Sequence, residues 1–263
     1  NLPNFTYEWR QTVRHIFERA SSGGISDGVR EMKTILNEIL RVFRTDDRTR
    51  PSEISDRCAL LQLTSEMRFP GDFVSGISKI ALSFEELFTG PIEALSSGTE
   101  KELVLSRRQI SCLLVGCVLG LFSFTSSTSF GCLGLVNSDT PTPILRGIIH
   151  YLVRVVDETP RGFIKFRRHV VTESLDWPKM EQPLCEHEVR ENGAIEDVDD
   201  SIQVDFASKR IGGLVLRGGC VQEEIRFGVV SPELIAAMLL CDPMAENEAI
   251  IIEGVENFSS YQG

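Results

Sequence analysis

The sequence has 263 residues, 42% hydrophobic and 25% charged, which is the composition of a globular protein with one large or two ordinary domains. Its formal net charge of −11 repels polyanions and argues against nucleic-acid binding, so a phosphate-bearing ligand would need a local site. Seven cysteines without a Cys-x-x-Cys pair or a Cys/His cluster predict reduced thiols in the nucleus or cytoplasm and no metal centre. Residues 1–10 lack the apolar core of a signal peptide, so we expect no secretion.

The first part of the chain has apolar residues at helical spacing, and we expect residues 1–159 to form a helical region. Helices are predicted over Tyr7–Ala20, from Ser26-Asp27 to Phe43, from Pro51 to Leu63, and over Ala81–Phe88, Ser106–Phe124 and Pro141–Val156. The most apolar run, Ile110–Phe124, is shorter than the ~20 residues that cross a bilayer. It therefore favours a buried helix over a membrane span, and we expect no membrane association.

After Pro160 the pattern changes, and residues 160–263 are predicted to form a second domain with strands and helices. Strands are predicted in "GFIKFRRHVV" (162–171), in "SIQVDFAS" (201–208) and at Ala249–Ile252, the last buried on both faces. A helix is predicted to begin after the N-cap Ser231, with Pro232 at its first position. The fold class is thus α+β or α/β.

Two features of this second part invite a functional interpretation. A basic strip is either a phosphate contact or the charged outer face of a half-exposed strand, and we favour the strand face. It consists of Lys165, Arg167, Arg168 and His169. The Gly-rich loop 212–219 allows positive φ and close approach to a ligand, but its spacing matches no nucleotide motif.

Glu223 and Glu224 follow this loop directly. On a helix these neighbours would point about 100° apart, so we do not expect both to face one spot. An inert acidic helical turn is the simpler interpretation of their spacing alone. A glutamic acid that works as a general acid near neutral pH needs burial to raise its pKa.

A resemblance to a known family favours a catalytic role for these glutamates over an inert acidic turn. The segment "VDFASKRIGGLVLRGGCVQEEIRF" (204–227) resembles the signature of poly(ADP-ribose) glycohydrolases, and its sequence is most similar to that of plant members. The similarity continues through "SPELIAAMLL" and "NEAIIIEGVENFSSYQG", and more weakly upstream through "LSRRQISCLL", "GFIKFRRHV" and "EQPLCE". The resemblance implies a helical accessory region followed by a macrodomain with a mixed sheet and flanking helices.

The resemblance also implies an activity and roles for individual residues. It implies hydrolysis of the ribose–ribose glycosidic bonds of poly(ADP-ribose), or of polymer on modified proteins, without a metal or other cofactor. Glu224 would be the general acid and then the base. The other implied site residues are Glu223 for ribose hydroxyls, Asp205, Gln222 and Ser208 in the site, Gly212 and Gly213 over the ribose and diphosphate, and Ile195 and Glu196 at the adenine.

Three departures from the family pattern put turnover in question. Leu214 replaces the third glycine of a triplet, which would strain a backbone that needs positive φ and would place an isobutyl group near the ligand. Ser208 replaces an asparagine and offers a shorter hydrogen-bonding group. The signature's continuation beyond Gly263 is missing, so we expect a gene fragment, a piece of a longer protein or a shortened paralogue.

Two hypotheses therefore remain open from the sequence. The chain is a poly(ADP-ribose) glycohydrolase, or it is a catalytically impaired relative that at most binds ADP-ribose polymer. The retained Gln222-Glu223-Glu224 favours the first, whereas Leu214 and Ser208 favour the second. An unrelated helical scaffold would leave residues 204–227 unexplained.

Overall fold

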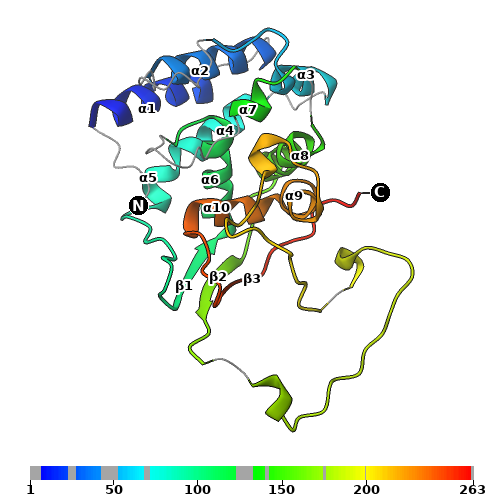
Figure 1. Ribbon diagram of the computed structural model, residues 1–263. Helices are drawn as coiled ribbons and strands as arrows, with labels where there is room; N and C mark the ends of the chain where they lie inside the picture. The colour runs from blue at the N-terminus through cyan, green and yellow to red at the C-terminus, as the bar shows by residue number, and fades with distance from the viewer. Residues whose placement is uncertain are drawn as a thin grey trace.

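The computed structural model describes residues 7–22, 28–42, 53–67, 72–122, 133–139, 142–173, 176–198 and 200–261 (Figure 1). Helices make up most of the first part of the chain. Their bounds are α1 Tyr7–Ser22, α2 Gly28–Val42, α3 Ala59–Glu66, α4 Phe73–Leu82, α5 Phe84–Leu87, α6 Arg107–Val118, α7 Leu133–Val136 and α8 Pro143–Asp157. Their apolar faces join one core, and in Figure 1 α1 and α2 lie at the end of the molecule away from the sheet.

The helical periodicity located these elements well where an amphipathic stripe was long. Met32, Ile35, Leu36, Ile39 and Leu40 of α2 are all buried, as the predicted stripe requires. The predicted starts at Ser26-Asp27 and Pro51-Ser52 and the end of the run at Phe124 lie outside the described residues.

Three predicted helix boundaries are wrong among the described residues. The third helix begins at Ala59, because the backbone N–H groups of Ile54 and Ser55 donate to the Asn37 and Asn137 side chains and hold the chain outside a helix. The segment predicted as Ala81–Phe88 is divided between α4 and α5 at Ser83, whose hydroxyl donates to the Ile80 carbonyl. The segment predicted as a helix over Ser106–Phe124 forms α6, which ends already at Val118.

The α6 helix is the buried central helix that its apolar sequence predicts. Residues Ile110–Val118 are all buried, and Ser106 and Gln109 close its N-terminus with a capping box. Within the described ranges, no helix combines the length and the apolar character that a bilayer crossing requires.

The sheet has three antiparallel strands in the order β1-β2-β3. They are β1 Lys101–Ser106, β2 Phe163–Val170 and β3 Glu248–Glu253, and Phe166 pairs with Leu103 on one side and Ile252 on the other. The sequence pattern missed β1, whose six residues carry only a brief alternation. This sheet joins a strand from the first part of the chain to two from the second, and the division at 159/160 stays a prediction.

The strand prediction for 201–208 is wrong, and the one for 249–252 is right in position but wrong in burial. Residues 202–207 have no regular secondary structure and pair with no described strand, and Ile202 and Phe206 are 96% and 83% exposed. The three isoleucines of β3 are only half-buried, because β3 is the last strand in the sheet and has one neighbour.

The basic strip on β2 does not share one face. Ile164, Phe166 and Arg168 are buried, whereas Lys165, Arg167 and His169 point to the other side. The buried Arg168 guanidinium donates to the Leu95 carbonyl at 3.0 Å, to the Asp242 carbonyl and to the Glu248 carboxylate. Arg168 is therefore a structural cross-link and contributes nothing to a surface strip.

The second part of the chain continues through short helical turns. These are η1 Trp177–Lys179, η2 Ile195–Asp197, η3 Val215–Arg217, α9 Gln222–Ile225, the π-helical turn η4 Arg226–Val230, η5 Pro232–Ala236 and α10 Ala237–Leu240. Ser231 does not cap the following turn as predicted, because its hydroxyl donates to the Glu256 carbonyl at 2.7 Å. Figure 1 shows residues 176–198, between β2 and the Gly-rich loop, lying away from the body of the protein.

Candidate active site

The Gly-rich loop folds back on the first turn of α9. Gly212, Gly213 and Gly218 have φ angles of 87°, 50° and 80°, the left-handed region that favours glycine, whereas Gly219 does not adopt it. The 3₁₀ turn η3 lies between these glycines. The loop thereby presents several backbone N–H groups to the side chains of α9.

Glu223 is buried beneath this loop. Its Oε1 accepts the Gly212 N–H at 2.5 Å, and its Oε2 lies 3.5 Å from the Ser208 nitrogen. Burial raises the pKa of Glu223 to about 6, and the nearby Asp205 and Glu224 carboxylates add to the rise while the Gly212 and Ser208 N–H groups oppose it. This carboxyl group therefore titrates much nearer to neutral pH than an ordinary glutamate.

Glu224 is also buried, with 5% of the residue exposed. Its Oε1 accepts the Leu214 N–H at 2.9 Å and its Oε2 accepts the Val221 N–H at 3.0 Å, which also caps the start of α9. Both oxygens are thus held by the loop that precedes the helix. The sequence hypothesis required this side chain to be turned inward, and it is.

The two carboxylates meet at Gly213, so the expectation that they would face different spots is wrong. A Cβ atom on Gly213 would lie 2.6 Å from Glu224 Oε1 and 2.8 Å from Glu223 Oε2. Helical geometry separates the two Cα–Cβ directions, but glutamate has two further rotatable bonds, and the loop N–H groups draw both carboxylates to one point. Only glycine fits at that point.

Asp205 and Glu196 lie on the segment that leads to the loop. One carboxylate oxygen of each is buried without a hydrogen-bond partner among the described residues, as is Gln203 Oε1. Burial, followed by repulsion from Glu224, raises the pKa of Asp205. Burial lowers the pKa of the Arg226 guanidinium, against the attraction of Glu196 and Asp205.

The remaining predicted site residues lie nearby with fewer contacts. Gln222 is the half-buried first residue of α9, Ser208 is exposed, and Ile195 is 38% exposed at the start of η2. The Glu196 carbonyl accepts a hydrogen bond from Asn257 at 3.4 Å, and Asn257 also accepts one from Arg226 at 2.7 Å. These bonds connect Glu196, one of the two predicted adenine contacts, to Arg226 at the start of η4.

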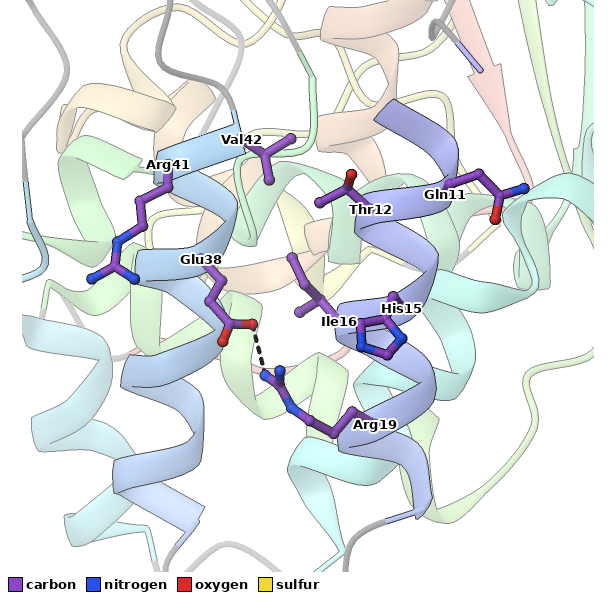
Figure 2. Close-up of a pocket in the computed structure, with 8 residues that line it drawn as sticks. All are labelled: Gln11, Thr12, His15, Ile16, Arg19, Glu38, Arg41 and Val42. Atoms are coloured by element: carbon purple, nitrogen blue, oxygen red, sulfur yellow. Dashed lines mark hydrogen bonds and ion pairs between the residues drawn. The ribbon is translucent and has the colours of Figure 1, made fainter. Parts of the chain in front are cut away.

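A separate hollow of about 500 Å³ lies between α1 and α2 (Figure 2). An ion pair from Arg19 to Glu38 at 2.6 Å lies within it. The hollow shares no residue with the Gly-rich loop or α9, so it contributes nothing to the carboxylate site. Its lining consists of Gln11, Thr12, His15, Ile16, Arg19, Glu38, Arg41 and Val42.

Two sequence models of a known family match consecutive parts of this chain. Residues 61–168 match "Poly (ADP-ribose) glycohydrolase (PARG), helical domain", and residues 174–263 match "Poly (ADP-ribose) glycohydrolase (PARG), Macro domain fold". The chain belongs to the poly(ADP-ribose) glycohydrolase family. The predicted fold class, a helical region followed by a macrodomain-type region, is thereby confirmed. The implied mixed sheet is not seen among the three described strands, which pair antiparallel.

Similar proteins of this glycohydrolase family come from a plant and a nematode. Poly(ADP-ribose) glycohydrolase 1 of Arabidopsis thaliana is 42% identical over 137 residues, 51% of this chain and 25% of that protein. Poly(ADP-ribose) glycohydrolase 1 of Caenorhabditis elegans is 33% identical over 193 residues, 71% of this chain and 24% of that protein. The matched region thus spans about a quarter of the length of these relatives.

The glycohydrolase resemblance makes Leu214 a notable residue of the loop. Its φ of −103° is ordinary for any residue, so the strain expected from the missing glycine is absent. Its side chain is 55% exposed, and its Cβ would lie 2.9 Å from a Cβ placed on Gly219. Leu214 therefore affects the site through the space its side chain occupies.

One set of contacts at this site was not foreseen from the sequence. Arg107 at the start of α6 pairs with the buried Glu233, which follows α9 and η4 in the chain. A buried glutamate two residues after a helix N-cap looks like an ordinary first-turn acid, and its partner is 126 residues away. Sequence spacing carries no signal for such a pair.

Proposed function

We propose that this chain carries the acid–base carboxylates of a poly(ADP-ribose) glycohydrolase, which hydrolyses ribose–ribose O-glycosidic bonds and releases ADP-ribose. The observation that supports it most is the convergence of buried Glu223 and Glu224 on Gly213, at the junction of the Gly-rich loop and α9. A random acidic turn would leave both side chains in solvent. Here two buried acids lie at one loop–helix junction, and glycoside hydrolysis uses such a pair of carboxyl groups.

The two carboxyl groups have different roles in the proposed reaction. Glu224, as the general acid, gives a proton to the departing ribose oxygen as the anomeric C–O bond breaks, and an oxocarbenium-like species forms. The resulting Glu224 carboxylate then takes a proton from the water that attacks the anomeric carbon, which restores the acid. Glu223, with a pKa of about 6, is mainly ionised at neutral pH and holds ribose hydroxyls by accepting their hydrogen bonds.

The remaining site residues would bind the rest of the substrate. The unpartnered oxygens of Asp205 and Glu196 are acceptors for which ribose hydroxyls or an adenine amino group are suitable donors. Gly212 and Gly213 would pass over the scissile ribose and the diphosphate, with Gln222 and Ser208 beside them. Ile195 would contact the adenine face. No cofactor takes part in this proposal.

A second candidate is a protein that binds ADP-ribose polymer without turning it over. The exposed Leu214 side chain beside the carboxylates favours this alternative, because an isobutyl group there competes with a ribose for space. The two candidates differ in one observable, since both predict polymer binding and only the first predicts release of ADP-ribose.

The deciding experiment measures release of ADP-ribose from purified polymer by this chain, with Glu224→Gln as the test variant and Glu246→Gln as the control. Glu246 is exposed, so its substitution makes the same chemical change away from the site. Turnover that is lost in Glu224→Gln and kept in Glu246→Gln supports the enzyme. Polymer binding with no turnover by the unaltered chain supports the binder.

The substrate proposal extends to poly(ADP-ribosyl)ated proteins, with no sequence-specific nucleic acid or membrane as partner. The proposed compartment is the nucleus or the cytoplasm, which is consistent with the six described cysteines being free thiols. Fractionation of cells that produce the tagged protein would test this compartment, and recovery from the secreted fraction would contradict it.

A further inference from the structure

A buried ion pair joins the helical part of the protein to the segment that follows the carboxylates. Arg107 Nη1 lies 2.6 Å and 2.7 Å from the two Glu233 oxygens, and Glu233 is 1% exposed. The other amino group of Arg107 donates to the Gly254 carbonyl at 2.5 Å. Burying a charge pair is weak evidence of stabilisation, because desolvation offsets the attraction. The position of the Arg107–Glu233 pair between two parts of the chain therefore calls for another explanation.

Two further groups complete the surroundings of Glu233. The Tyr151 hydroxyl of α8 lies 3.4 Å from Glu233 Oε1 and exchanges a 2.9 Å hydrogen bond with Ser111 of α6. The Glu256 N–H donates to Glu233 Oε2 at 3.1 Å. Burial raises the pKa of Glu233, against Arg107 and the Glu256 N–H. Both Glu233 oxygens are therefore held by elements that lie outside η5.

Glu233 is directly linked in the chain to the proposed catalytic turn. The turns α9, η4 and η5 follow one another with only Ser231 outside a helical turn, so Glu223 and Glu224 begin a segment that the buried ion pair fixes at its other end.

Between these ends, η4 packs closely on α8. A Cβ on Gly147 of α8 would collide with the Gly228 carbonyl and lie 3.0 Å from Val229 Cα. A Cβ on Gly228 would lie 2.6 Å from Ile144 Cγ2. The segment can be displaced little without breaking one of these contacts.

We propose that Arg107 is a positioning residue, which, through Glu233, lets the helical part of the protein fix the turn that carries Glu223 and Glu224. The inference rests on the proposed function for its catalytic consequence, whereas its geometric consequence can be tested without turnover. Arg107 touches no substrate in this proposal. Its effect reaches the carboxylates only through the continuous segment from α9 to η5.

The main test variant is the double substitution Arg107→Met with Glu233→Met, made in this chain. Removing both charges leaves no unpaired buried ion, so the protein is expected to fold, whereas Arg107→Gln alone would strand the Glu233 carboxylate. Arg107→Lys keeps the charge but cannot reproduce the two-contact geometry of a guanidinium. Lys165→Gln is the control, since it removes a surface ion pair with Glu253 at 2.6 Å.

Two readouts are measured on each folded variant. The first is the pH titration of the Glu223 carboxyl carbon by NMR, and the second is the rate of ADP-ribose release from polymer. We expect the double variant and Arg107→Lys to shift the Glu223 midpoint from about 6 towards the ordinary 4.5. We expect them to lower kcat by about tenfold or more with little change in KM, because small misplacements of catalytic groups have large effects.

The outcomes separate the two proposals. A folded double variant with an unchanged Glu223 titration and unchanged kcat would overturn the positioning role and leave the pair purely structural. If the unaltered chain releases no ADP-ribose, the proposed function fails, and the NMR titration alone then decides the positioning role. Lys165→Gln should change neither readout, and an equal shift in that control would also overturn the inference.

Discussion

The backbone N–H of Leu214 donates to Glu224 Oε1 at 2.9 Å, so the residue that replaces a family glycine holds the proposed acid through its main chain. This bond is independent of the side chain at position 214. A substitution there should therefore leave the Glu224 carboxylate in place while changing the space in front of it.

The substitution Leu214→Gly tests whether Leu214 affects the site through backbone strain or through the volume of its side chain. At a φ of −103° no strain exists to be relieved, so glycine should lower the free energy of unfolding by about 0.5–1 kcal/mol through added freedom of the unfolded chain. Polymer binding should become tighter, and further so with Ser208→Asn. Urea unfolding and polymer titration check both parts, and a stabilised variant with unchanged binding would refute this interpretation of Leu214.

Gly213→Ala should damage the site, because the added methyl group would occupy the point at which the two carboxylates meet. The new Cβ would lie 2.6 Å and 2.8 Å from the two carboxylate oxygens, at a φ of 50°. We expect a loss of about 1–3 kcal/mol in the free energy of unfolding, together with loss of turnover. Gly90→Ala is the matched control, because a Cβ there meets nothing within 4 Å. Equal effects of the two substitutions would show that the carboxylates do not occupy that position.

The raised pKa of Glu223 predicts a pH dependence of stability. Because the folded-state pKa is about 6 and the ordinary value is 4.5, the folded protein retains a proton that the unfolded chain releases between these values. This contribution to stability is fully present below pH 4.5 and is lost as the pH rises through 6. Relative to the unaltered protein, Glu223→Gln should gain about 2 kcal/mol in unfolding free energy between pH 4 and pH 7.5.

Urea unfolding over that pH range tests this prediction, with Glu246→Gln as a control for an exposed glutamate. Glu248 does not interfere, because the N–H groups of Ala245 and Gly98 lower its pKa to about 2. Its stabilising contribution is therefore lost only as the pH falls from 4.5 towards 2. Parallel pH profiles for Glu223→Gln and the unaltered protein would contradict the raised pKa.

Three cations on or just before the Gly-rich loop give a prediction about polymer association. Lys209, Arg210 and Arg217 are exposed, and none forms an ion pair with another residue that the structure describes. In a protein with a net charge of −11, they add exposed positive charge to the segment that carries the Gly-rich loop. Changing all three to glutamine should make the log–log salt dependence of polymer binding shallower by about 2.

The matched control for this prediction is the triple change of Arg41, Arg57 and Lys79 to glutamine. These cations are also exposed but lie on or beside the N-terminal helices α2, α3 and α4. The control alters net charge by the same amount and should leave the salt dependence nearly unchanged. Similar slopes for both triple variants would mean that the loop cations do not face the polymer.

The sequence predicted the elements whose stabilising contacts are local. The stripe of α2, the capped start of α8 and the alternation in β2 all specify their own secondary structure within a few residues. The strand predicted at 201–208 had the same local pattern and failed, because a strand also needs a neighbour to accept its hydrogen bonds. β3 was predicted but its exposure was not, since its place at the edge depends on sheet order.

The residues of the candidate site remain a prediction, and their geometry did not follow from the sequence. The Gln222-Glu223-Glu224 motif supplied the two glutamates of the hypothesis, while their convergence depends on N–H groups of Gly212, Leu214 and Val221 that only the folded loop aligns. The Arg107–Glu233 pair spans 126 residues and follows from no periodicity. Long-range electrostatic pairs of this kind become visible only when the packing is known.

The central claim is that Glu224 delivers the proton to the departing ribose, and a substrate with an activated leaving group tests it most directly. A nitrophenyl ADP-riboside loses a leaving group that needs no protonation, whereas polymer loses a ribose oxygen that does. The rates of hydrolysis of both substrates should be measured for the unaltered protein and for Glu224→Gln. We predict that Glu224→Gln loses turnover of polymer by about 100-fold or more and cleaves the activated substrate at a rate much closer to that of the unaltered protein. Equal losses on the two substrates, or undiminished turnover of polymer, would contradict the assignment of Glu224 as the acid.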